Sequence, residues 1–101
     1  AAVDAARDAG SLLISDTARS ASDVVPRLVT AGYTTAFAEI EQQLSQSGDD
    51  RIDAVAVQAG VGGLASAGTM WARLTRRGRS PSVIVVEPEP AACVMAALAA
   101  G

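Results

Sequence analysis

The chain has 101 residues, which is the length of one small domain. Its formal net charge of −3 gives it no general attraction for nucleic acid or for anionic membranes. It contains no Lys and no His, so a Schiff-base lysine and a histidine general base are both excluded within these residues. Cys93 is the single cysteine, so neither a disulfide framework nor a cysteine-based metal site is expected.

Few large side chains are available to build a core. Half of the residues are hydrophobic, but 22 residues are Ala, and the only aromatic residues are Tyr33, Phe37 and Trp71. A core this thin suggests that some apolar faces pack on other parts of a larger protein. We therefore expect the chain to be an internal fragment of a longer one.

The beginning of the chain contains one candidate functional residue, Asp16. Residues 1–9 are rich in good helix formers, and the apolar run at residues 11–15 predicts a buried strand. Asp16 follows that strand, and functional groups of open α/β sheets gather beyond the carboxyl ends of strands. The alternative is that Asp16 caps a turn through its own backbone.

Two helices are predicted between residues 23 and 47. Ser22 or Asp23 can cap the first helix, and Pro26 is tolerated in its first turn. Gly32 interrupts the apolar spacing, so Thr34 or Thr35 is expected to cap a second helix that ends near residue 47. Glu39 and Glu41 diverge around this second helix and are predicted to belong to a solvated face.

Strands and helices alternate in the second half of the chain. The pattern predicts a strand at residues 53–58, a turn at 59–63, a helix at 64–77, a strand at 82–87 and a helix at 91–100. The strand at 82–87 is continuous in β-branched residues, as strands covered on both faces tend to be. This order predicts an α/β fold with a three-layer parallel sheet flanked by helices, of which the chain forms part.

The turn at residues 59–63 is suited to binding an anion. Its glycine amides are not obstructed by a Cβ atom, and the helix that follows adds about half a positive charge at its N-terminus. The small residues at positions 65–68 let that helix lie close to the sheet. A phosphate group is the expected ligand.

Two known glycine-rich motifs differ from this turn. A Walker A loop is excluded because no Lys follows the glycines. A nicotinamide dinucleotide-binding (Rossmann) domain stays open as an alternative, because Glu87 ends the next strand, where such domains place an acidic residue for the ribose. Against it, the glycines fall at positions 60, 62, 63 and 68, which is not the spacing of that fingerprint.

Several segments, taken together, resemble a known family. They are Ser15-Asp16-Thr17, Pro26, Gly32-Tyr33-Thr34-Thr35, Gln58-Ala59-Gly60-Val61-Gly62, and Val86-Glu87-Pro88 with Cys93 five residues later. In this order and spacing they are similar to the fold-type II (tryptophan synthase β-like) pyridoxal-phosphate enzymes. Within that group the chain most resembles the diaminopropionate ammonia-lyase family. The resemblance extends over nearly the whole chain.

The resemblance implies a role for each segment. Residues 1–22 would end the smaller domain and form the crossover that carries Asp16, the active-site carboxylate that handles a substrate amino group or proton. Residues 23–101 would be part of the phosphate-binding α/β domain, with residues 32–34 beginning a helix packed on its sheet. Glu87 would lie near the cofactor ring, with a structural role as the preferred interpretation. The amides that hold the cofactor phosphate would be those of Gly60, Val61, Gly62, Gly63 and Leu64.

The implied reaction is α,β-elimination from 2,3-diaminopropionate to pyruvate and ammonia, with pyridoxal 5′-phosphate as cofactor. The ammonia-lyases usually carry Trp, Gly and Tyr after the Asp, where this sequence has Arg19, Ala21 and Ser22. A threonine or serine dehydratase of the same fold is therefore the second hypothesis. A non-catalytic domain of this fold, used for assembly, is the remaining alternative. Because the chain has no Lys to carry the cofactor, it is expected to be inactive alone.

The expected partner is a small amino-acid substrate, with no nucleic acid and no membrane, and the full-length protein is expected to be a homodimer. The sequence shows no secretory signal pattern and no apolar run long enough to span a bilayer. A cytoplasmic location is expected.

Overall fold

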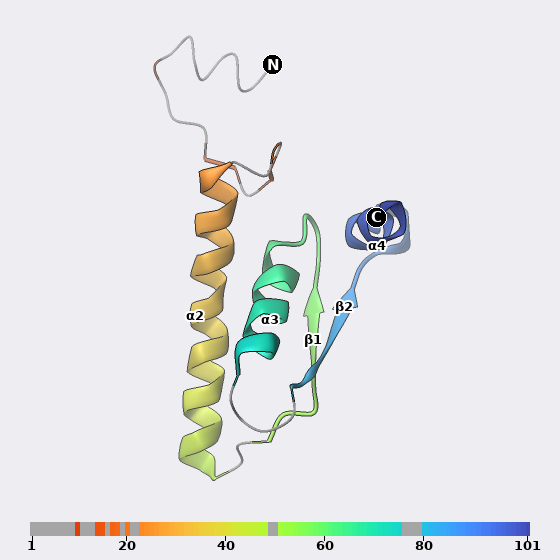
Figure 1. Cartoon of the computed structure of the whole chain (residues 1–101). Coiled ribbons are helices and arrows are strands. Elements are labelled where there is room, and N and C mark those ends of the chain that lie inside the picture. Colours follow the sequence, from red (N-terminus) through yellow and green to blue (C-terminus); the bar gives the residue numbers. More distant parts are fainter. Residues whose placement is uncertain are drawn as a thin grey trace.

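The computed structural model describes residues 10, 14, 15, 17, 18, 20, 23–48, 51–75 and 80–101. Figure 1 shows that α3 lies between α2 and the two strands, and that α4 lies beyond the carboxyl ends of the strands. This arrangement confirms the predicted α/β class. The elements in chain order are α2 (Val24–Ser47), β1 (Ala54–Gln58), α3 (Gly63–Leu74), β2 (Ser82–Val86), the 3₁₀ helix η1 (Glu89–Ala91) and α4 (Cys93–Ala100).

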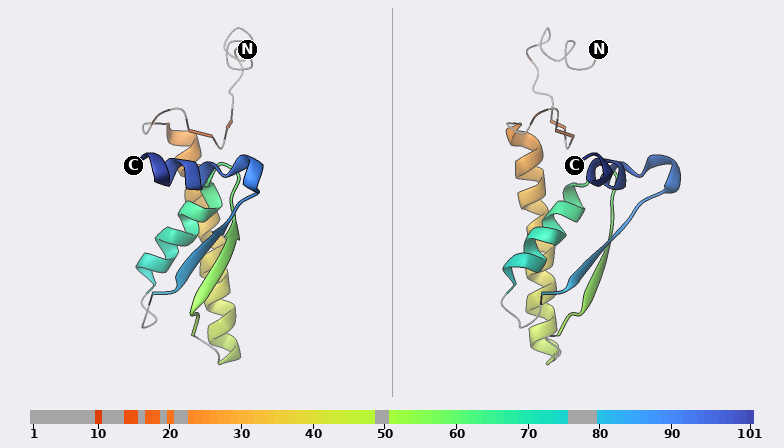
Figure 2. Two further views of the ribbon diagram at one scale, coloured as in Figure 1. Left: turned by 90° about the vertical axis from the view of Figure 1, so that its right-hand side faces the viewer. Right: turned by 45° about the vertical axis from the view of Figure 1, so that its right-hand side comes forward.

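The two strands form a parallel pair in which Val55 is the partner of Val83 and Val57 is the partner of Val85. Val57 is buried on the face that α3 covers, and Val55 and Val83 pack against the same core. On the opposite face, Ile84 is 53% exposed. In Figure 2, α2 and α3 lie to one side of the strands and α4 crosses their carboxyl ends.

Within the described residues one face of β2 is uncovered, because both long helices pack on the same side (Figure 2), so coverage of both faces is not confirmed. The three-layer arrangement stays a prediction. The strand predicted at residues 11–15 is not seen in its described part, since Ile14 and Ser15 lie outside any strand. Its other residues lie outside the described part of the chain.

One continuous helix, α2, replaces the two helices predicted between residues 23 and 47. Gly32 lies inside it, because an interior glycine costs a helix only about 1 kcal/mol relative to Ala and packing against α3 outweighs that cost. Thr34 does not cap a new helix; its hydroxyl donates to the carbonyl of Ala31 within α2, at 2.6 Å. Asp23 is the N-cap residue, as predicted, but its carboxylate accepts hydrogen bonds from the backbone N–H and the hydroxyl of Ser20.

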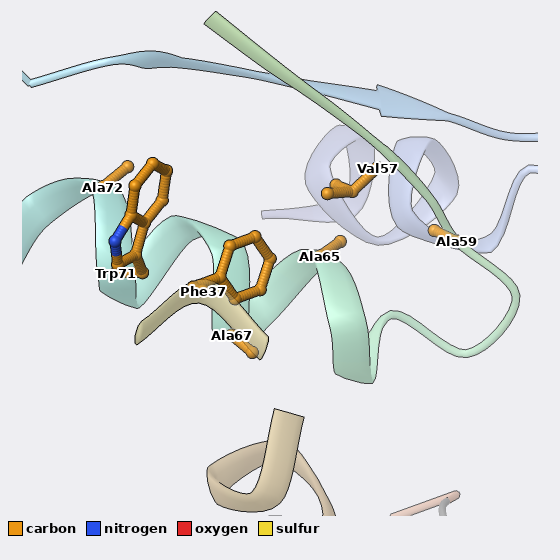
Figure 3. Packing of buried hydrophobic residues seen from close by; sticks show 7 residues of the cluster. All are labelled: Phe37, Val57, Ala59, Ala65, Ala67, Trp71 and Ala72. Carbon is orange, nitrogen blue, oxygen red and sulfur yellow. The ribbon is translucent and has the colours of Figure 1, made fainter. Parts of the chain in front are cut away.

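A small core lies where α2, α3 and β1 meet. Phe37 of α2 stacks on Trp71 of α3, with ring centroids 5.3 Å apart and an interplanar angle of 20°. Gly68 allows this contact, because a Cβ atom there would lie 3.0 Å from Cζ of Phe37. The small residues of α3 thus bring it close to α2 as well as to the sheet. The other buried residues, labelled in Figure 3, are Val57, Ala59, Ala65, Ala67 and Ala72.

Glu41 connects α2 to the end of α3. Thr75, the C-cap residue of α3, donates its hydroxyl hydrogen to Oε1 of Glu41 at 2.5 Å. Glu39 is exposed. The predicted solvated face is therefore correct for Glu39 and wrong for Glu41, because the partner of Glu41 lies 34 residues away in the sequence.

Two glycines in the helices provide a matched test of the close packing at Phe37. Gly32→Ala should raise the free energy of unfolding by about 1 kcal/mol, because Ala is the better helix former and its Cβ would meet nothing within 4 Å. Gly68→Ala should lower the free energy of unfolding by about 1 kcal/mol. The added Cβ crowds Phe37 at a cost of roughly 1–3 kcal/mol, which exceeds the gain in helix propensity. Urea unfolding followed by circular dichroism measures both values. Equal stabilisation by the two substitutions would contradict the close contact.

Candidate functional site

The glycine-rich turn connects the carboxyl end of β1 to the first residue of α3. Gly62 is the N-cap residue of α3 and has a left-handed backbone, with φ of 90° and ψ of 1°. Its carbonyl accepts the first hydrogen bond of the helix, from the N–H of Ser66 at 2.8 Å. A residue with a Cβ atom adopts this backbone only with strain, so glycine is required here for the strand to turn directly into the helix.

The start of α3 presents backbone donors without a side-chain acceptor. Because Gly62 has no side chain, no cap hydrogen bond reaches the first turn. The first N–H groups of a helix, here those of Gly63, Leu64 and Ala65, have no carbonyl partner within the helix. Together with the positive end of the helix dipole, they form an anion-binding arrangement.

A cavity of about 240 Å³ lies at this turn. All five residues predicted to bind the phosphate line it: Gly60, Val61, Gly62, Gly63 and Leu64. A Cβ atom at Gly60 would meet nothing within 4 Å, so the cavity is open on that side. The other described lining residues are Tyr33, Gln58 and Ala59, so none of the described residues at the cavity is acidic. The cavity thus has room for an anion the size of a phosphate group, and phosphate binding by these residues stays a prediction.

Tyr33 and Gln58 are cavity residues to which the sequence assigned no ligand contact. The resemblance implied that Tyr33 lies at the start of a helix. The structure places it within α2, because α2 begins at Val24. Its ring reaches the turn, since a Cβ atom on Gly63 would lie 3.5 Å from Cε2 of Tyr33. Gln58 directly precedes the turn, and its side-chain amide is able to donate to an anion. Gln58 stands directly before the turn in the sequence, and that position was the available signal, whereas Tyr33 is distant in the sequence and is brought to the turn by the fold.

The turn is packed between two helices. Tyr33 and Thr30 of α2 lie against Gly63, at 3.5 Å and 3.7 Å from the position of a Cβ atom there. On the other side, Cγ2 of Val94 in α4 lies 3.3 Å from the position that a Cβ atom on Gly62 would occupy. The shape of the turn therefore depends on both α2 and α4.

A larger groove of about 810 Å³ adjoins the cavity and shares Val61, Gly62 and Gly63 with it. It runs between the first turns of α2 and the first turns of α3. Among the described lining residues Arg27 carries the charge, and Val24, Leu28 and Met70 contribute apolar surface. The groove has the size and mixed lining of a small-molecule site.

Asp16, the predicted catalytic residue, lies outside the described residues, as do Arg19, Ala21 and Ser22. Of the two neighbours of Asp16, Thr17 donates its N–H to Oγ of Ser15 at 3.2 Å. The role of Asp16 stays a prediction.

Glu87 follows β2 and binds the start of α4. Its Oε1 accepts the N–H of Val94 at 2.7 Å, and its Oε2 accepts the N–H of Met95 at 2.9 Å. Glu87 does not line the cavity. These bonds support the structural interpretation of this residue.

An ion pair lies at the opposite end of β1 from the cavity. At the start of β1, Arg51 donates to Asp53, and this hydrogen bond together with the charge of Asp53 raises the pKa of Arg51 above its ordinary value. The pair is exposed and lies at the end of β1 away from the cavity. Among the described residues, no group of three or more His, Cys, Asp or Glu side chains could hold a metal ion. Nor is any described helix long and apolar enough to cross a membrane.

Comparison with known proteins identifies one matching family and two relatives. The sequence profile of a family described as "Pyridoxal-phosphate dependent enzyme" matches residues 1–101. The diaminopropionate ammonia-lyase of Salmonella typhimurium is 30% identical over 89 residues, which cover 88% of this chain and 22% of the relative. A probable D-serine dehydratase of Burkholderia thailandensis is 39% identical over 80 residues, which cover 74% of this chain and 18% of the relative. The chain spans about a fifth of the length of each relative. No solved structure matches it.

Two glycine-to-alanine substitutions in the turn test whether the left-handed backbone of Gly62 requires glycine. Gly62→Ala should lower the free energy of unfolding by about 1–2 kcal/mol, because its φ of 90° is costly for any residue with a Cβ atom and Val94 is in the way. Gly60→Ala should change it by less than about 0.5 kcal/mol, because its Cβ would enter open space. Urea unfolding measures the difference. Equal effects at the two positions would contradict the left-handed turn.

Proposed function

This chain belongs to the family of pyridoxal-phosphate-dependent enzymes, as its motifs predicted, and we propose that the turn at Gly60–Leu64 binds the 5′-phosphate of that cofactor. The whole protein is then an ammonia-lyase that converts 2,3-diaminopropionate to pyruvate and ammonia by α,β-elimination. The observation that carries the proposal is the cavity at the N-terminus of α3, which is lined by the glycine turn and, among the described residues, by no acidic side chain.

The chemical character of the cavity supports a phosphate ligand. The protein has a net charge of −3, so an anion is attracted only where local donors outweigh the overall charge. Unpaired amides at the start of α3 supply those donors, and the helix dipole adds partial positive charge. Glu87 follows β2, the strand that pairs with β1. Its carboxylate binds the amides of α4 and does not line the cavity.

Pyridoxal phosphate, when bound, supplies an electron sink for a negative charge that develops on the substrate α-carbon. The residues of this chain hold and orient it. The amides of Gly60, Val61, Gly62, Gly63 and Leu64 bind the phosphate, and Asp16 holds or moves a proton at the substrate amino group. No Lys occurs among the 101 residues, so the lysine that carries the cofactor lies outside them and the chain alone is inactive.

The substrate is proposed from the relatives and from the motifs. The relative that aligns with 88% of this chain is a diaminopropionate ammonia-lyase, which supports 2,3-diaminopropionate. A serine or threonine dehydratase is the second candidate, supported by the 39% identity to a probable D-serine dehydratase. The absence of the usual aromatic residues at Arg19 and Ser22 also favours this second candidate. The family match gives no support to a nicotinamide dinucleotide as the ligand.

Cofactor binding is tested by placing a carboxylate at the cavity. Gly60→Asp should weaken binding of pyridoxal phosphate by about tenfold or more, because the two negative charges repel each other in a site of low dielectric constant. Gly32→Asp makes the same change of charge on an exposed face of α2 and should leave binding unchanged. Titration followed by cofactor absorbance measures both. Saturable binding of a nicotinamide dinucleotide, with none of pyridoxal phosphate, would contradict the proposal.

Substrate choice is tested with the cofactor-loaded full-length protein. Release of 2-oxo acid should be at least about tenfold more efficient, as kcat/KM, from 2,3-diaminopropionate than from D-serine, L-serine or L-threonine. The measurement is 2-oxo acid formation coupled to its reduction. A preference for serine or threonine would instead assign the protein to the dehydratases.

A further inference from the structure

The start of α4 is capped from outside the helix. Its N-cap residue is Ala92, which has no side chain that could accept a hydrogen bond. The carboxylate of Glu87 takes that role, because its two oxygens accept the N–H groups of Val94 and Met95 at 2.7 Å and 2.9 Å. A carboxylate that accepts two amide hydrogens at a helix N-terminus also gains from the helix dipole. Glu87 therefore ties the end of β2 to the first turn of α4.

The connection between Glu87 and α4 is short and stiff. Pro88 and Pro90 restrict its backbone, and the N–H of Ala91 donates to the carbonyl of Pro88 at 2.9 Å. With the connection restricted in this way, the two bonds to Glu87 set the direction in which α4 leaves the sheet. Figure 2 shows the result, in which α4 crosses the carboxyl ends of the strands.

Val94 links this cap to the glycine turn. The same residue whose N–H binds Glu87 places its Cγ2 3.3 Å from the position of a Cβ atom on Gly62. Gly62 is the residue with the left-handed backbone, and its conformation decides where the first amides of α3 point. A shift of α4 would move Val94 away from Gly62, while Tyr33 would still pack beside Gly63.

We propose that Glu87 is a positioning residue for the phosphate-binding turn: it holds α4, and Val94 of α4 holds Gly62. Glu87 does not line the cavity, so it acts through Val94 and not by touching the ligand. Its negative charge is balanced by two amides and by the dipole of α4, which makes it compatible with an anion nearby. The inference rests on the proposed function, because it takes the cofactor phosphate as the ligand of the turn.

The test compares a ligand with and without the phosphate. The full-length protein, freed of cofactor, is titrated with pyridoxal phosphate and separately with pyridoxal. Glu87→Gln removes the charge and leaves one oxygen to accept, and Val94→Ala removes the contact with Gly62 but keeps the cap. Each should raise the dissociation constant of pyridoxal phosphate by about tenfold, as expected for a misplaced binding group. The dissociation constant of pyridoxal should change by less than about twofold.

Glu89→Gln is the matched control, because Glu89 is an exposed carboxylate two residues further on, in η1. It should leave both dissociation constants unchanged. Because Glu87 and Val94 act through one contact, the double variant should weaken binding by less than the product of the two single effects. Equal weakening of pyridoxal phosphate and pyridoxal would overturn the inference, as would a Glu87→Gln variant that behaves like Glu89→Gln.

The unsubstituted protein separates this inference from the proposed function. If it binds pyridoxal phosphate no better than pyridoxal, the turn does not hold the phosphate and the proposed function fails, and with it the inference. If it prefers pyridoxal phosphate but neither variant changes that preference, the role of Glu87 alone is overturned.

Discussion

The left-handed backbone of Gly62 is the constraint on which the site depends. It lets β1 turn into α3 without a longer loop, and it leaves the helix without a side-chain cap. Both consequences favour an anion, because the first amides of α3 stay free of intrahelical and side-chain acceptors. The conformation is supported from two sides, by Tyr33 against Gly63 and by Val94 against Gly62. The candidate anion site, formed by backbone atoms, is thus flanked by packing from helices that precede and follow it in the chain.

The small residues of α3 serve the same arrangement. Ala65, Ala67 and Gly68 are buried, and the absence of larger side chains brings α3 close to both β1 and α2. Phe37 and Trp71 supply the large apolar surface of the core by stacking on each other. This core stabilises one side of the sheet and holds the N-terminus of α3 at the carboxyl end of β1. The opposite side of the strands carries exposed apolar residues, among them Ile84 and Val86.

Two glutamates of the described chain, Glu87 and Glu41, are bound to helix ends. Glu87 binds the amides of α4, and Glu41 accepts the hydroxyl of Thr75 at the far end of α3. Neither lines the cavity. An acidic protein can therefore present a turn suited to an anion, because these two carboxylates are bound to helix ends and the glycine turn keeps its donors. The family to which the chain belongs uses a cofactor that carries such an anion.

The sequence by itself determined the features that depend on neighbouring residues. These include the strand, glycine turn and helix that form the cavity, the α/β class, and the family, because local backbone preference and motif spacing are written in adjacent positions. It did not predict that α2 continues through Gly32, because packing against α3 outweighs the weak local preference against an interior glycine. Nor did it predict the partners of Glu41 and Glu87 or the contact of Val94 with Gly62. Only the tertiary structure decided these, because each joins residues that the fold, and not the chain order, brings within a few ångströms of each other.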